Sequence, residues 1–184
     1  MSKQTFAAAD VAEFPPASHT AVANTTTRTN LWVPSLWTPI PAFDPKPGKA
    51  YLLRCGGIIS TTGTPTIVFN PTFGQSSTPG SNLALGATTT WTLGTLSSAP
   101  WWAEFVLGFR TLGIAASGAT ATGNGVVVIG GAAAAVGQAV PMGGTVVTTA
   151  DHTTAQGLSL DVTWGTASAS NTITAQWTLL QSLN

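Results

Sequence analysis

Charged side chains are the scarcest component of this sequence. Asp, Glu, Lys and Arg make up 7% of the 184 residues, whereas roughly 25% is usual for a soluble domain. Six basic and six acidic residues give a formal net charge of zero, and no basic run is present that would neutralise the phosphates of a nucleic acid. A surface this poor in charge has little electrostatic protection against association, which favours a protein covered by copies of itself or by a partner.

Cysteine and long apolar runs are also scarce. Cys55 is the single cysteine, which excludes an internal disulfide, and its position before two glycines is typical of a small buried apolar residue. The N-terminal residues MSKQTFAAADVAEF contain two acidic side chains and no apolar run of signal length, so we expect synthesis in a reducing cytoplasm. No stretch approaches the roughly 18 apolar residues of a membrane helix, and we expect no membrane contact.

Residues suited to enzymatic chemistry are few and scattered. Of the two histidines, His19 lies in the irregular N-terminal part and His152 follows Asp151 in a predicted loop, where turn formation explains the aspartate. The carboxylates form no close-spaced pair, and Glu104 and Arg110, on one side of a predicted strand, suit ion pairs at the surface or with other chains. No His, Cys and Asp cluster has metal-ligand spacing. We therefore predict no catalytic residue, no cofactor and no metal.

What the sequence does contain, from Lys49 onward, is one predicted strand after another, separated by Gly, Pro, Ser and Asn. The clearest alternates Leu158, Leu160, Val162 and Trp164 with polar residues. Irregular and often long connections favour an all-β, antiparallel, jelly-roll-like β-sandwich of about eight strands with an extended N-terminal arm. The eight predicted strands are residues 49–60, 64–73, 88–96, 101–113, 125–131, 143–150, 156–164 and 171–180.

The last predicted strand, NTITAQWTLL, also alternates. One set of side chains is predicted to face the core and the other to form a neutral outer row that suits packing on a sister subunit. The predicted core set is Ile173, Ala175, Trp177 and Leu179, and the predicted outer set is Thr174, Gln176 and Thr178.

The N-terminal part divides from this domain, with residues 1–46 predicted as an arm and docking segment and residues 47–184 as the sandwich. The stretch LWVPSLWTPIPAFDPKPGK, residues 31–49, carries five prolines, which exclude a helix and a central strand. Its large apolar side chains must be buried, either on the chain's own sandwich or on a neighbour. The predicted partner-binding residues are Phe14, Leu31, Trp32, Leu36, Trp37 and Phe43.

Three stretches of the sandwich carry a resemblance to a known class of protein. PGKAYLLRCGGIISTTGTPTIVF, SAPWWAEFVLGFRTLG and LDVTWGTASASNTITAQWTLLQSL together resemble a β-domain of virion structural proteins of tailed bacteriophages, especially those of actinobacteria. The resemblance implies a non-enzymatic head decoration (cement) or minor capsid protein that binds the major capsid protein and self-associates, as a homotrimer. It implies synthesis in the host bacterial cytoplasm and a final location on the capsid surface of the virion.

Two other functions remain open at this stage. A phage tail or baseplate component would have the same sequence features, although the chain has no coiled-coil heptads or triple-helix repeat of a fibre shaft. A carbohydrate-binding sandwich would use an exposed Trp102 or Trp91 as a stacking platform, but it would have few Asp, Asn and Glu side chains for hydroxyl recognition. Enzymatic activity is a more distant third.

Overall fold

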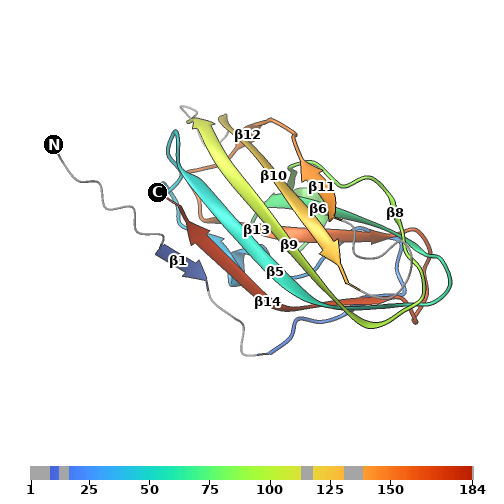
Figure 1. Ribbon diagram of the computed structural model, residues 1–184. Coiled ribbons are helices and arrows are strands. Elements are labelled where there is room, and N and C mark those ends of the chain that lie inside the picture. Colours follow the sequence, from blue (N-terminus) through green and yellow to red (C-terminus); the bar gives the residue numbers. More distant parts are fainter. Residues whose placement is uncertain (1–8, 13–16, 113–117, 131–138, 184) are drawn as a thin grey trace.

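The computed structural model describes residues 9–12, 17–112, 118–130 and 139–183 of the chain. Within these residues the strands form two antiparallel sheets, one of eight strands and one of six (Figure 1). In the view of Figure 1 the eight-stranded sheet, called the larger sheet below, lies in front of the six-stranded, smaller sheet. The predicted all-β antiparallel sandwich is confirmed.

The larger sheet carries most of the long strands. Two short strands, β2 (Val22–Ala23) and β12 (Val147–Ala150), extend it by pairing with β14 and β10. Its main order is β1 (Ala9–Ala12), β14 (Thr172–Ser182), β5 (Ala50–Thr61), β9 (Leu96–Thr111), β10 (Ala119–Ile129) and β11 (Ala139–Gly143).

The smaller sheet is built around two long strands, β13 (Gln156–Trp164) and β6 (Thr66–Gly74). Short strands flank this pair: β3 (Thr29–Asn30) and β4 (Pro39–Ile40) on β13, and β7 (Leu83–Ala84) and β8 (Trp91–Thr92) on β6. The chain crosses between the sheets so that β5 pairs with β14 and β6 with β13. This nested pairing of the first two long strands with the last two is the jelly-roll-like feature of the fold.

The predicted strands match the long strands well and the short ones poorly. Residues 156–164 coincide with β13, whereas residues 88–96 contribute the two residues of β8 and the start of β9. The pattern also missed β11, whose sequence AVPMG does not read as a strand. β10 begins at Ala119, six residues before the predicted start, because its first half, ATATGNG, has few large apolar side chains.

The prediction that prolines exclude a helix from residues 31–49 is wrong for one turn, α1 (Pro34–Trp37). Pro34 occupies the first turn, where a backbone N–H has no helical partner, so the missing donor costs nothing there. A 3-10 turn, η1 (Pro79–Ser81), lies between β6 and β7. Neither turn approaches the length of a membrane-crossing helix, and none of the described residues forms one.

Much of the predicted arm forms part of the sandwich. The strand β2 pairs with β14, and β3 and β4 both pair with β13. The side chain of Ile40 is fully buried. From Val22 onward, the part of the chain before residue 47 therefore contributes strands and core residues to the sandwich rather than a separate arm.

The core lies between the two sheets and is rich in aromatic side chains. Phe109 contacts Tyr51 and Phe73 edge to face, with ring centroids 6.1 Å and 5.7 Å away, an arrangement that aromatic rings prefer. Cys55 is fully buried, as predicted. Burial raises the pKa of its thiol, so the group stays protonated.

A β-bulge in β14 overturns the predicted faces of the last strand. Ala175 is opposite Gly57 and Trp177 is opposite Gly56, so Gln176 is an extra residue on β14. An extra residue reverses the alternation beyond it. Before the bulge Ile173 and Ala175 face the core as predicted.

Beyond the bulge the prediction is wrong. Thr178 and Leu180 are fully buried in the core, whereas Trp177 and Leu179 lie half-buried on the outer face.

Gly57 allows the bulge to form, and a side chain at this position should destabilise the fold. A Cβ on Gly57 would collide with the carbonyl oxygen of Thr174 and lie 2.9 Å from the backbone nitrogen of Gln176. Backbone atoms cannot move aside as a flexible side chain can, so Gly57→Ala should lower the free energy of unfolding by about 3 kcal/mol in urea titrations. Gly80→Ala is the matched control, since open space surrounds Gly80. Equal stability of the two variants would show that the bulge does not depend on Gly57.

Candidate functional site

The six predicted partner-binding residues differ in how far the fold buries them. Phe14 lies outside the described residues. Leu31 and Trp32 are buried, at 2% and 3% exposure, and Trp37 packs partly buried against the core. Leu36 and Phe43 are exposed, at 72% and 65%. Of the described residues predicted to bind a partner, these last two present large apolar surface to solvent.

Leu31 and Trp32 attach residues 31–49 to the chain's own sandwich. The backbone N–H of Leu31 donates to the carbonyl of Leu160 at 3.0 Å. The indole N–H of Trp32 lies 3.1 Å from both the hydroxyl of Thr38 and the carbonyl of Leu158. Of the two burial sites that the sequence left open for these side chains, the structure shows the chain's own domain. Neither is free to fill a groove on a partner.

Phe43 is held in position by its backbone. Its φ of 61° lies in the left-handed region, which few residues other than glycine and asparagine adopt readily. Its N–H donates to the carbonyl of His152 at 2.7 Å, and its ring meets the imidazole of His152 edge to face at 6.5 Å. The exposed ring therefore stands on a fixed backbone.

Asp44 fixes the next turn of the segment. Its two carboxylate oxygens accept hydrogen bonds of 2.6 Å from the ammonium group of Lys49 and from the hydroxyl of Tyr51. Burial alone would raise the pKa of Asp44, but the hydrogen bonds from Lys49 and Tyr51 and the nearby lysine charges lower it overall. The cluster ties Asp44, the residue after Phe43, to β5 through Tyr51.

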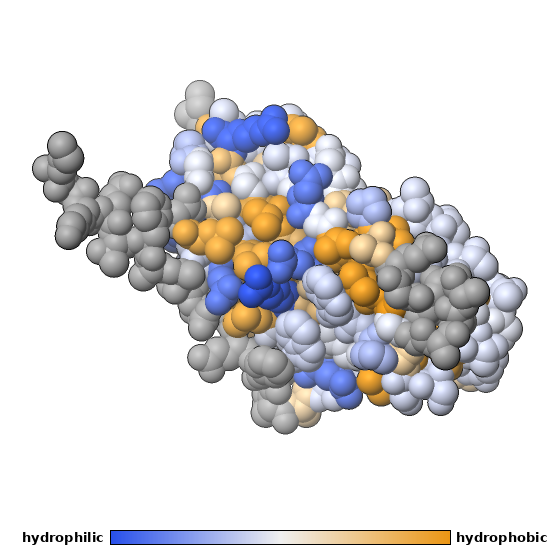
Figure 2. Space-filling view, viewed as in Figure 1, coloured by the Kyte–Doolittle hydropathy of each residue, from blue (hydrophilic) through white to orange (hydrophobic). Residues whose placement is uncertain are grey.

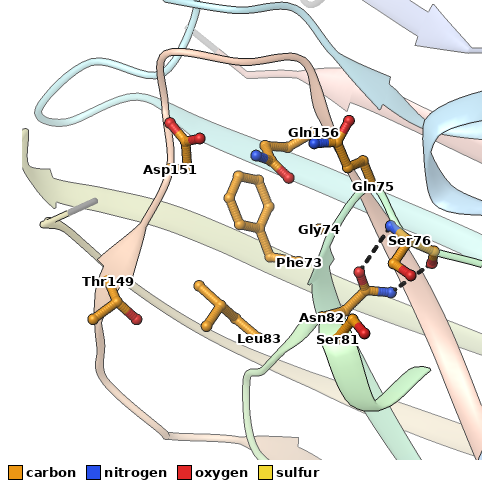
Figure 3. Close-up of a pocket in the computed structure, with 10 residues that line it drawn as sticks. All are labelled: Phe73, Gly74, Gln75, Ser76, Ser81, Asn82, Leu83, Thr149, Asp151 and Gln156. Atoms are coloured by element: carbon orange, nitrogen blue, oxygen red, sulfur yellow. Dashed lines mark hydrogen bonds between the residues drawn. The ribbon is translucent and has the colours of Figure 1, made fainter. Parts of the chain in front are cut away.

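A polar hollow of about 260 Å³ lies beside β6 and the loop that follows it (Figure 3). Asn82 crosses it and exchanges hydrogen bonds of 3.0 Å and 2.9 Å with the backbone of Ser76. The Asp151 carboxylate accepts hydrogen bonds from Thr153 and Thr154, which is ordinary turn chemistry. The lining is Phe73, Gly74, Gln75, Ser76, Ser81, Asn82, Leu83, Thr149, Asp151 and Gln156.

The two histidines occupy packing positions. The ring of His19 lies 6.0 Å from that of Trp32 and 5.0 Å from that of Trp37, and burial lowers its pKa. His152 is buried beneath Phe43. In the described parts of the chain, no three His, Cys, Asp or Glu side chains gather closely enough to hold a metal ion.

One buried charged network was not found from the sequence. Asp161 is fully buried and lies 3.2 Å from the guanidinium of Arg28. It also accepts hydrogen bonds from Ser159 at 3.0 Å and from Thr72 at 3.4 Å. Burial raises the pKa of Asp161 to about 6, although the hydrogen bond from Ser159, the charge of Arg28 and the hydrogen bond from Thr72 oppose the rise.

The network lies on the outer side of the smaller sheet, beneath other parts of the chain. Leu160 and Val162, the neighbours of Asp161 in β13, face the core, so Asp161 faces the opposite side of the sheet. Arg28 donates to the carbonyl of Pro79, and Asn30 donates to the carbonyl of Ser76 at 3.2 Å, so residues 28–30 are joined to the loop after β6. This network fastens the N-terminal strands to the smaller sheet.

Comparison of the chain with protein-family models, with curated protein sequences and with solved structures finds no match.

The raised pKa of Asp161 predicts a pH dependence of stability. The carboxyl binds a proton more tightly in the fold, with a pKa of about 6, than in the unfolded chain, at about 3.9. Its contribution to the free energy of unfolding should therefore fall as the pH rises from about 4 to about 6, by roughly 3 kcal/mol at most. The variant Asp161→Asn should lose this part of the decline in urea titrations at pH 4.5 and 7.

Asp151→Asn provides the matched control for this measurement. Burial tends to raise the pKa of Asp151, but its hydrogen bonds with Thr153 and Thr154 lower it overall. Its effect on stability therefore falls below about pH 4, outside the window tested. If Asp161→Asn declined between pH 4.5 and 7 as steeply as the natural chain, the carboxyl of Asp161 would not be the group that titrates.

Proposed function

We propose that this chain is a non-enzymatic virion structural protein of a tailed bacteriophage, a head decoration or cement protein that binds the major capsid protein from outside and stabilises the shell. Its location would then be the capsid surface. The proposal joins the resemblance of the sandwich sequence to such proteins with the surface that the fold presents.

The observation that carries the proposal is the exposure of Leu36 and Phe43. Among the large apolar side chains of the described residues, these two are the most exposed, at 72% and 65%. Both lie on residues 31–49, where prolines, the buried Trp32 and the Asp44 cluster restrict the backbone. Exposed apolar side chains on a segment that is already ordered suit a docking surface, because little conformational entropy is lost on binding.

The scarcity of charge supports the same function. A decoration protein covers much of its surface with the shell and with neighbouring copies, and each buried charge would cost desolvation energy. With 7% charged residues and a formal net charge of zero, this chain has few charges to desolvate and no strong repulsion from its own copies.

The tail or baseplate alternative shares these features and is separated by copy number, since hundreds of copies per virion indicate the shell. For the carbohydrate-binding alternative, one of the two candidate platforms is lost because Trp91 is buried, whereas Trp102 is exposed at 45%. A glycan array with the full chain distinguishes that alternative from the proposal.

The test is binding to empty shells of the phage that encodes the chain, measured by co-sedimentation. The double variant Leu36→Gln and Phe43→Asn keeps backbone preferences, since glutamine suits a helical turn and asparagine tolerates a left-handed φ. We expect the double variant to bind at least about tenfold more weakly, because each large apolar anchor contributes on the order of 1–2 kcal/mol.

Val146→Thr is the control, since Val146 is an exposed apolar side chain, at 47%, outside the proline-rich segment. Point variants are preferable to deletion of residues 1–43, because that deletion would remove β2, β3 and β4 from the sandwich. Binding of the double variant as strong as that of Val146→Thr would overturn the proposed docking surface.

A further inference from the structure

The outer face of the larger sheet, on the side away from the smaller sheet, carries an ordered apolar surface. Because adjacent strands are in register, its outward side chains on β14, β5, β9 and β10 align in rows across the sheet. Figure 2 looks onto this face and shows hydrophobic surface over these strands, interrupted by a hydrophilic area. Trp102 and Val106, at the centre, are exposed at 45% and 37%.

In two of the three complete rows, residues of the same class lie at matching positions on either side of the line between β5 and β9. One row is polar, apolar, apolar, polar, and the next is apolar, charged, charged, apolar. Read from β14 to β10, the three complete rows are Gln181, Leu52, Val106 and Asn124; Leu179, Arg54, Glu104 and Val126; and Trp177, Gly56, Trp102 and Val128.

The charged residues of these rows are Arg54 and Glu104, and they lie on the two sides of this line. The guanidinium of Arg54 is 2.8 Å from the carboxylate of Glu104, and their side chains are 47% and 38% exposed. A single exposed ion pair of this kind contributes little to stability. Its position at the centre of an apolar face indicates a different role.

We propose that two copies of this chain associate through this face, about a two-fold axis that lies in the interface and runs between β5 and β9. This axis places β5 of one copy over β9 of its partner, and β14 over the partner's β10. In every row, a side chain on one side of the line therefore meets the partner's side chain from the other side of the line. Arg54 then faces the partner's Glu104, and Leu52, which is only 8% exposed, lies opposite the partner's Val106. The four charges form one network in which every charge has two opposite neighbours.

The chain's own Trp177 covers Gly56 on this face. A Cβ on Gly56 would lie 2.7 Å from the carbonyl oxygen of Trp101 and 2.8 Å from the indole of Trp177, so the glycine leaves room for the Trp177 ring over β5. In the proposed pair the exposed ring of the partner's Trp102 therefore packs on the indole of Trp177.

The face is large enough for a specific contact. With strands about 4.8 Å apart and residues rising about 3.3 Å, four strands of about seven residues cover roughly 450 Å² in projection. Projecting side chains increase the accessible area, and the outward residues Ala139 and Pro141 of β11 continue the apolar surface. Two such faces cover roughly 900 Å² in projection, close to the lower end of specific interfaces at about 1,200 Å², so we expect a weak association that depends on concentration.

A second copy suits this face better than a partner of different composition. The pattern is complementary to itself, and a net charge of zero leaves no long-range repulsion between copies. The inference does not rest on the proposed capsid function, since the face lies on the larger sheet and needs no shell. It predicts pairs, whereas the resemblance implies a homotrimer.

The test is the mass of the full chain in solution, measured by sedimentation at increasing concentration. We expect a shift from 18.7 kDa toward twice that value. Arg54→Glu and Glu104→Arg should each dissociate at least about 100-fold more readily, because like charges then face each other across the axis. Mixing the two variants should restore association, because the two acidic groups at positions 54 and 104 of one variant then face the two basic groups at positions 104 and 54 of the other.

Arg110→Glu is the control, because it changes the charge equally at the end of β9, outside the rows. Far-ultraviolet circular dichroism verifies that each variant is folded. A natural chain that is monomeric at every concentration, or strictly trimeric, would overturn the inference. So would single variants that associate like Arg110→Glu, or a mixture that stays monomeric.

Discussion

The pairing of β14 with β5 is the constraint on which the rest of the structure depends. β5 lies inside the larger sheet, between β14 and β9, and β14 also receives the N-terminal strands β1 and β2. The bulge at Gln176 divides this pairing into two registers, and Gly57 leaves the space that the bulge requires. Because of this one extra residue, Thr178 and Leu180 fill the core, while Trp177 and Leu179 join the outer rows of the larger sheet.

Long strands with strict alternation could be predicted from the sequence, and interruptions of the alternation could not. The strand β13 was predicted to its ends because Leu158, Leu160, Val162 and Trp164 share one face without a break. In β14 apolar and polar residues alternate equally well in the sequence, yet the bulge reverses which of them face the core. A bulge depends on the partner strand, here on Gly57, and a single strand's pattern contains no information about its partner.

The exposed apolar residues and the buried charged network were harder to predict from the sequence than the long strands. The sequence correctly placed large apolar side chains on a proline-rich segment, but it could not separate Trp32, which the core accepts, from Leu36, which it leaves exposed. That choice depends on the alignment of the segment with β13. The network of Arg28 and Asp161 joins distant parts of the chain, and the rows of the larger sheet exist only once four strands are in register. Both are tertiary features for which local patterns give no signal.

Two surfaces of the chain carry the proposals. Residues 31–49 expose Leu36 and Phe43, the proposed contacts with a shell, and the outer face of the larger sheet is the proposed contact with a second copy. Hydroxyl-radical oxidation of Trp102, followed by mass spectrometry at low and high protein concentration, tests directly whether another copy covers this face. Trp102 should become protected from oxidation as the concentration rises, while the exposed Phe43 should not. Equal oxidation of Trp102 at all concentrations would show that no second copy covers the face.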